Sequence, residues 1–141
     1  MVTDLTRVRT AVAEMVGISL RHQPFLGAVV LISAAHPEVA RRGSRYAQEL
    51  GDGFARVVLR VSDHITHPDA EAAVRSCFAT VFATALIRVA YGPGFATASA
   101  VDDDTFTASL GETAVRYLLA DGAVEPADAA RFTPGVQGRL A

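Results

Sequence analysis

The stretch PDAEAAVRSCFATVFATALIRVAYGPG, residues 68–94, decides the fold. Pro68 and the acids that follow it are typical of the first turn of a helix, and the closing Tyr91-Gly92-Pro93-Gly94 is a strong stop signal. At about 100° per residue, large apolar side chains fill one broad sector between these signals. They are Val74, Phe78, Val81, Phe82, Ala85, Leu86 and Val89. We therefore predict a helix that lies at the centre of a helical protein.

The remaining sectors of this helix carry no normal charged surface. One is a narrow sector of small side chains, Ala79, Ala83 and Ala90, and the other holds Ser76, Thr80, Thr84 and Arg88. A helix that is apolar nearly all round is surrounded by protein. An arginine in such a helix needs an acceptor, because burial of an unpaired charge is expensive. Arg88 therefore has two interpretations, as half of a structural ion pair or as a polar group that faces a ligand cavity.

Helical periodicity continues outward from this segment in both directions. Apolar residues recur every three or four positions, and prolines, glycines and acids mark the helix ends. The predicted helices are 4–21, 24–35, 37–65, 68–91 and 102–120. We treat 37–65 as one long helix that passes through Gly51-Asp52-Gly53, straight or kinked. The fold class is thus all-α, a single bundle of about five helices in residues 1–122, and residues 123–141 are predicted to form a partly irregular tail.

Composition and charge exclude several classes of protein. The chain has 141 residues, half of them apolar, which is enough for one domain with a real core. A net charge of −2 gives no strong nucleic-acid footprint, although residues 1–60 hold eight arginines and five acids and residues 61–141 hold five arginines and ten acids. The uncharged apolar stretches 23–37 and 76–87 are shorter than the roughly 20 residues of a membrane span. Without a signal-peptide pattern, we expect a cytoplasmic protein that contacts no membrane.

The best candidates for catalysis or metal binding are His64 and His67, beside Asp63. Histidines three residues apart can share a helix face and a metal ion. Pro68 follows directly, however, so His67 lies at a helix end, and no HExxH motif accompanies the pair. Cys77 lies among apolar residues with no histidine nearby in sequence to activate it. We expect no catalysis, metal or cofactor. A small helical enzyme or metal protein that uses these histidines is the alternative.

The last predicted helix has more apolar surface than one core contact requires. Its apolar residues span well over half of the circumference: Phe106, Leu110, Gly111, Ala114, Val115, Tyr117, Leu118 and Leu119. A single core-facing stripe needs little more than about 100°. We therefore predict a homodimer in which the last two helices of each subunit form a four-helix arrangement. The predicted interface residues are Ala79, Ala83 and Ala90 with Gly111, Val115 and Leu118. A purely structural helical dimer without a cavity is a further alternative.

Three segments resemble a known family. They are LRHQPFL at residues 20–26, HPEVARR at residues 36–42 and LIRVAYGPG at residues 86–94. In length, order and helix ends, residues 4–120 resemble the C-terminal ligand-binding and dimerisation region of tetracycline-repressor-type (TetR-type) transcriptional regulators. The resemblance implies a cavity between the first, third and fourth helices for an apolar or amphipathic small-molecule effector. The expected lining residues are Arg88, Thr84, Thr80, Tyr46, Leu50 and Phe54.

The chain departs from the TetR-type pattern at its start. Such regulators begin with a three-helix DNA-binding domain of roughly fifty residues that contains a helix-turn-helix. This sequence begins past that point, and no segment of it has the helix-turn-helix pattern. We therefore expect that the chain alone does not bind DNA specifically, and that what the resemblance implies for it is effector binding and dimerisation.

Overall fold

The part of the chain that the structure describes forms a bundle of five α-helices, as its apolar periodicity predicts. A computed structural model describes residues 2–95 and 100–119. The elements are α1 (Val2–Arg21), α2 (Gln23–Ile32), α3 (Pro37–Val58), the 3₁₀ segment η1 (Leu59–His64), α4 (Ala70–Tyr91) and α5 (Asp103–Leu119). Within these described residues there is no β-strand. The all-α prediction is confirmed, and the predicted tail at 123–141 lies outside the described residues.

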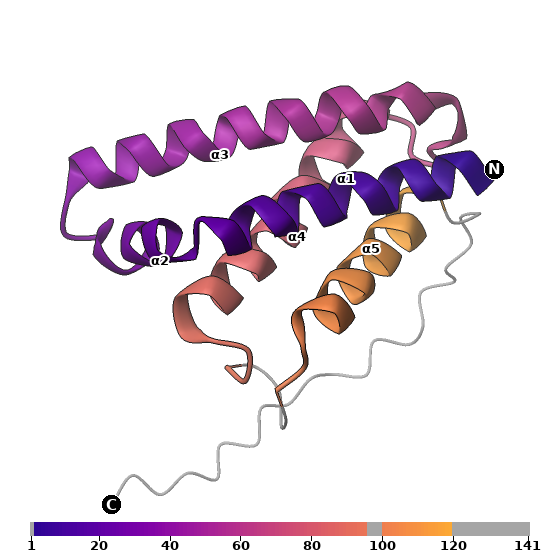
Figure 1. Cartoon of the computed structure of the whole chain (residues 1–141). Helices are drawn as coiled ribbons and strands as arrows, with labels where there is room; N and C mark the ends of the chain where they lie inside the picture. The colour runs from indigo at the N-terminus through magenta and orange to yellow at the C-terminus, as the bar shows by residue number, and fades with distance from the viewer. Residues whose placement is uncertain (1, 96–99, 120–141) are drawn as a thin grey trace, which may run out of the picture.

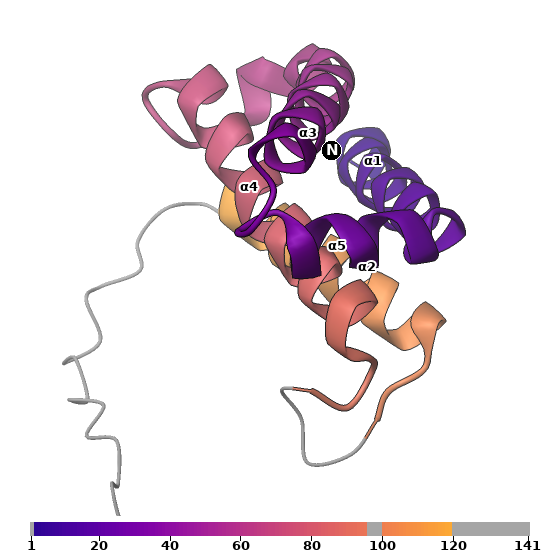
Figure 2. The ribbon, with the colours of Figure 1, turned by 90° about the vertical axis from the view of Figure 1, so that its left-hand side faces the viewer.

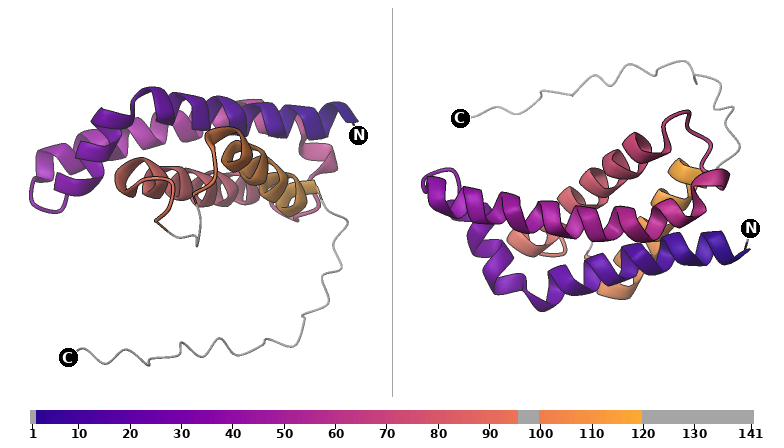
Figure 3. Two further views of the ribbon diagram at one scale, coloured as in Figure 1. Left: turned by 60° about the horizontal axis from the view of Figure 1, so that its bottom comes forward. Right: turned by 90° about the horizontal axis from the view of Figure 1, so that it is seen from above.

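The helices lie in two layers, closed at one end by α2. Antiparallel α1 and α3 lie side by side, with α4 and α5 crossing beneath them (Figures 1 and 3). The short helix α2 crosses between the end of α1 and the start of α3, as the turned view makes clear (Figure 2). The N-terminus lies at the opposite end of the bundle, near η1 (Figure 1). This arrangement gives the molecule two distinct ends.

Helix α4 is the central element, as the opening sequence stretch indicates. It contacts each of the other four α-helices. Its buried side chains include three aromatic and aliphatic residues of the predicted broad sector, Phe78, Val81 and Phe82. Phe78 packs against Phe82 with ring centroids 5.2 Å apart and against Phe54 of α3 at 5.6 Å. The aromatic side chains of α4 therefore bind the two layers together.

The helix boundaries follow from local sequence signals. Pro24 and Pro37 occupy the first turns of α2 and α3, where the missing amide proton costs nothing. Asp69 caps α4 by accepting a hydrogen bond from the Ala72 amide at 3.0 Å. Asp102 caps α5 in the same way, by accepting from the Thr105 amide at 2.7 Å. Each predicted start is therefore within a few residues of the observed one.

The prediction of a single helix from 37 to 65 is wrong at its C-terminal end. The α-helix stops at Val58 and tightens into the 3₁₀ segment, in which Val61 has non-helical φ and ψ angles of −107° and 22°. The tighter winding keeps Val58, Val61 and Ile65 buried in the core. It also brings Thr66 to the end of α5, where its amide donates to the Leu118 carbonyl at 3.0 Å. The apolar pattern is thus continuous although the helix is not.

The Gly51-Asp52-Gly53 segment leaves α3 unbroken. Gly51 is buried where α3 crosses α4, and a Cβ atom there would lie 3.0 Å from the Phe78 ring. Asp52 accepts from Arg75 of α4 at 2.6 Å. No atom lies within 4 Å of a Cβ built on Gly53. Gly51 therefore permits the close approach of the two helices, whereas Gly53 has no such role.

The two glycines give opposite predictions for substitution by alanine. Gly53→Ala should raise the free energy of unfolding by about 1 kcal/mol, the usual gain inside a helix. Gly51→Ala should lower it by about 1–3 kcal/mol, because the Phe78 ring is held between two other rings and cannot move aside. Urea unfolding followed by circular dichroism measures both. Equal gains for the two variants would contradict the packing of α3 on α4.

Candidate functional site

The two ends of the bundle are packed differently. Near η1, the core side chains Val8, Val58, Val74 and Leu118 are completely buried. Toward α2, α3 has no buried residue before Gly51, and α2 buries only Leu26 and Gly27. Three large apolar side chains at this end are substantially exposed: Phe25 at 52%, Leu31 at 57% and Ile32 at 42%. We call the α2 end, comprising α2 and residues 37–50, the loose end.

A hollow of about 330 Å³ lies at the loose end, between α2, α3 and α4. Its wall is formed by Leu26, Val29, Val30, Ser33, Ala40, Gly43, Ser44, Tyr46, Ala47, Phe82 and Leu86. None of these side chains is charged. Helices α2 and α3 approach closely beside the hollow, where a Cβ atom on Gly43 would lie only 2.6 Å from Val29 Cγ1. A wall of this kind suits the apolar part of a small molecule.

Tyr46 is the unusual polar residue of this wall. Its hydroxyl is buried and has no hydrogen-bond partner within the described residues. The Phe25 and Tyr46 rings pack edge-on, with centroids 6.2 Å apart and planes at 81°. Burial raises the pKa of the Tyr46 hydroxyl, and the positive charge of Arg21 opposes that rise. A buried, unpaired hydroxyl is unfavourable by about 1–3 kcal/mol, so this group is available to a ligand acceptor.

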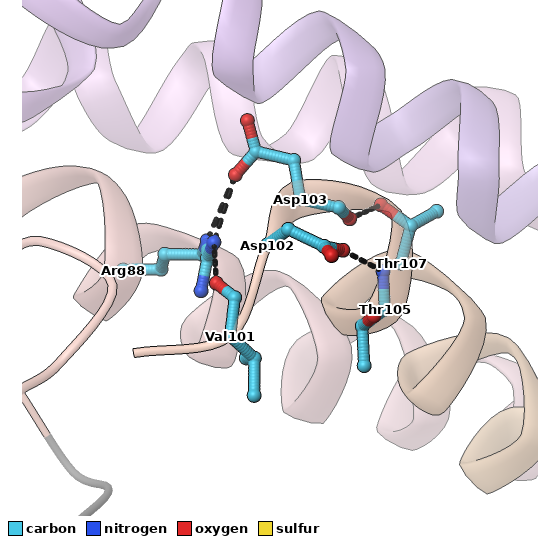
Figure 4. Close-up of polar contacts among 6 residues, drawn as sticks. All are labelled: Arg88, Val101, Asp102, Asp103, Thr105 and Thr107. Atoms are coloured by element: carbon cyan, nitrogen blue, oxygen red, sulfur yellow. Dashed lines mark hydrogen bonds and ion pairs between the residues drawn. The ribbon is translucent and has the colours of Figure 1, made fainter. Parts of the chain in front are cut away.

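Arg88 lies in a different part of the molecule, at the junction of α4 and α5. Its side chain is 8% exposed, and Nη2 donates to Asp103 Oδ1 at 2.8 Å and to the Val101 carbonyl at 2.6 Å (Figure 4). The guanidinium also lies 4.6 Å from the centroid of the Phe106 ring. Of the two interpretations of Arg88, the structural ion pair is therefore present, and it fixes the start of α5.

The six predicted lining residues do not meet in one cavity. Thr84 and Arg88 line a hollow of about 320 Å³ at the α4–α5 junction. Tyr46 lines the hollow at the loose end, Leu50 and Phe54 line a groove between α1 and α3, and Thr80 lines a recess between α4 and α5. This correction has a simple cause. Thr80 and Thr84 are on the exposed side of α4, where their hydroxyls donate to carbonyls of their own helix.

The predicted interface residues also separate into two groups. Ala79 and Ala83 are exposed and Ala90 is half-buried, so this face of α4 is open. Gly111, Val115 and Leu118 are instead buried within the subunit. The reason is that α1 packs along α5, and a Cβ atom on Gly111 would lie 3.6 Å from Arg9 Cγ. The surplus apolar face of α5 is therefore covered by α1, and the assignment of these three residues to a subunit interface is wrong.

An uncharged strip remains exposed on the outside of the bundle. It consists of Ser76, Ala79, Thr80, Ala83, Thr84 and Ile87 of α4 and Thr113 and Tyr117 of α5, and we call it the outer face of α4. Thr113 and Tyr117 adjoin Ser76 and Thr80 across a shallow recess between the two helices. The sequence pattern identified the α4 part of this strip but missed the α5 part, because α5 is apolar on the side that α1 covers.

The histidines and Cys77 have separate structural surroundings. His64 Nδ1 lies 2.7 Å from an Asp4 carboxylate oxygen, whereas His67 Nε2 lies 2.6 Å from the Tyr117 carbonyl oxygen. Among residues 2–95 and 100–119, no three His, Cys, Asp or Glu side chains are grouped as a metal site would require. Burial raises the pKa of the Cys77 thiol to about 11, which disfavours the nucleophilic thiolate at neutral pH. Within the described residues, His64 and His67 therefore have separate partners and do not share a site.

The length and apolarity of α4 meet the requirements of a membrane span, although its longest uncharged run is short. Half of the relevant window is buried inside the bundle, which is what a core helix of a soluble protein shows. Burial among four other helices is sufficient to explain its composition.

Comparisons with known proteins identify no relative. No protein-family model, curated protein or solved structure matches the chain.

The unpaired Tyr46 hydroxyl leads to a prediction about stability. Tyr46→Phe should raise the free energy of unfolding of the ligand-free protein by about 1 kcal/mol, because it removes a buried polar atom that has no partner. Ser19→Ala is the matched control, since the Ser19 hydroxyl is buried but donates to the Met15 carbonyl at 2.9 Å. That variant should be less stable than the parent. Urea unfolding distinguishes the two, and a loss of stability in Tyr46→Phe would show that the hydroxyl has a partner.

Proposed function

We propose that the chain is the small-molecule effector-binding and dimerisation domain of a TetR-like transcriptional regulator, without catalysis and without specific DNA binding of its own. The observation that carries this proposal is the hollow at the loose end, with its uncharged wall and the buried, unpaired Tyr46 hydroxyl. A cytoplasmic location belongs to the same proposal, because a regulator acts where its operator is.

The hollow at the loose end has the size and composition of a small-molecule site. Ligand pockets usually measure about 300–1,000 Å³ and are mostly apolar with a few placed polar groups. The hollow is near the lower limit at about 330 Å³, and Tyr46 is the placed polar group. Few side chains of α2 and residues 37–50 are buried, so these segments can adjust to a ligand with little loss of core packing.

A neutral apolar dye, N-phenyl-1-naphthylamine, tests the ligand site. We expect saturable binding to the parent chain, seen as enhanced fluorescence. Ala47→Leu should weaken it at least tenfold by filling the hollow, whereas Gln48→Leu, on the exposed side of the same helix, should not. Circular dichroism melts verify that both variants are folded. Dye binding that survives Ala47→Leu, or that is absent from the parent, would favour a purely structural dimer instead.

The outer face of α4 supports the dimer part of the proposal. Exposed helix faces are normally charged, but this one presents alanine, serine, threonine and isoleucine side chains. Small side chains allow two helices to approach closely, and a two-fold axis would place the same strip on both subunits. A stable pair buries about 800 Å² per subunit, which two helices of this length can supply.

Substitution of Ala83 tests the dimer. Sedimentation equilibrium at micromolar concentration should give a dimer of the parent chain. Ala83→Arg should give a monomer with unchanged helical content, because it places two uncompensated cations at the two-fold axis. Ala28→Arg makes the same change on the exposed side of α2 and should remain dimeric. A monomeric parent chain would refute the dimer.

A further inference from the structure

The charges around the loose end favour a negatively charged ligand. Between residues 21 and 50 the chain carries Arg21, Arg41, Arg42 and Arg45 but only two acids, Glu38 and Glu49. Glu38 pairs with Arg41 at 2.9 Å and with Arg42 at 3.4 Å, so it is shared between two arginines. Helix α4, which also lines the hollow, has no acidic residue after Glu71. An anion that approaches this end therefore meets a net positive charge.

Tyr46 lines the hollow, and the positive charge of Arg21 acts on it from α1. Arg21 is in the last turn of α1, and its guanidinium lies back over Gly17, where Nη1 would be 3.7 Å from a Cβ atom. Its positive charge acts on Tyr46, whose buried hydroxyl lacks an acceptor. A phenol O–H and a guanidinium are both hydrogen-bond donors, and a carboxylate is an acceptor only. The two groups together match a carboxylate head group.

Most of the wall of the hollow is apolar. Val29, Ala47, Phe82 and Leu86 come from three helices and provide contacts for an aliphatic or aryl body. Phe25, which packs edge-on against Tyr46, is 52% exposed and outside the main core, so its ring can rotate away without disturbing core packing. A head group can thus reach the hydroxyl.

We propose that the hollow at the loose end binds an amphipathic monocarboxylate, with the carboxylate at Tyr46 and Arg21 and the apolar body between α2, α3 and α4. This inference rests on the proposed function, since it names the chemical class of ligand for the same site. It adds a charge preference that a purely apolar cavity would lack, because an uncharged wall alone would favour the neutral form of any ligand.

Isothermal titration calorimetry with octanoate and its neutral counterpart 1-octanol tests the charge preference at pH 7.5. The parent chain should bind octanoate about tenfold more tightly than octanol. Arg21→Gln should reduce octanoate affinity about fivefold or more and leave octanol affinity unchanged. Tyr46→Phe should reduce octanoate affinity by at least as much and octanol affinity less, because the octanol hydroxyl also accepts a hydrogen bond. Arg116→Gln, the same loss of charge on the exposed side of α5, should change neither. Thermal melts establish that each variant is folded.

The outcomes separate this inference from the function on which it rests. Octanol binding that equals or exceeds octanoate binding in the parent would overturn the carboxylate preference while leaving a ligand site in place. Octanoate binding that is unaffected by Tyr46→Phe would overturn the assigned head-group contacts. Failure of both compounds to bind would contradict the ligand site itself.

Binding to an anionic lipid surface is tested separately. The loose end carries arginines, and its apolar side chains Phe25, Leu31 and Ile32 are exposed. Co-sedimentation with phosphatidylglycerol vesicles is measured for the parent and for Ala47→Leu. We expect no binding of either to vesicles. Vesicle binding that persists in Ala47→Leu would show that the loose end adsorbs to an anionic lipid surface, and would overturn the assignment of a free carboxylate in the hollow.

Discussion

The burial of α4 is the constraint on which the rest of the structure depends. A helix with almost no charged side chains between Arg75 and Arg88 must be covered by other helices or by a partner. The chain covers it with four helices, and the one charge near its end, Arg88, is neutralised by Asp103 at the start of α5. The start of α5 is therefore fixed by the same need that places α4 at the centre.

The four other α-helices do not cover α4 equally along its whole length. Near η1, α1 and α5 pack closely, and the α3–α4 connection is tied to the end of α5 through Thr66 and His67. At the other end, α2 is short, uncharged and partly exposed, and the first half of α3 has no fully buried residue. The hollow is a consequence of this unequal packing. Because local opening costs least where few side chains are buried, the region that can admit a ligand is also the least rigid.

Much of the fold could be predicted from sequence, because prolines, acidic caps and apolar periodicity act locally. The site could not be predicted to the same extent. The face of α5 that meets α1 depends on long-range packing. Val115 and Leu118 were therefore expected at a subunit interface but are buried within the subunit. The end of α3 at Val58 could not be predicted, because the apolar stripe stays in phase through the 3₁₀ segment. Tyr46 was identified as a lining residue, but its unpaired hydroxyl appears only when α1, α2 and α3 are packed together.

Hydrogen exchange measured by mass spectrometry can show whether the loose end holds the ligand site, since it reports which amides open in the free protein and which are protected by a ligand. Amides of α2 and residues 37–50 should exchange faster than those of α1 and α4 in the ligand-free protein, because few side chains are buried there. Saturating octanoate should then slow exchange at α2 and residues 37–50 and at the facing part of α4. Uniform protection along all five helices, or protection gained at the α4–α5 junction instead, would contradict a ligand site at the loose end.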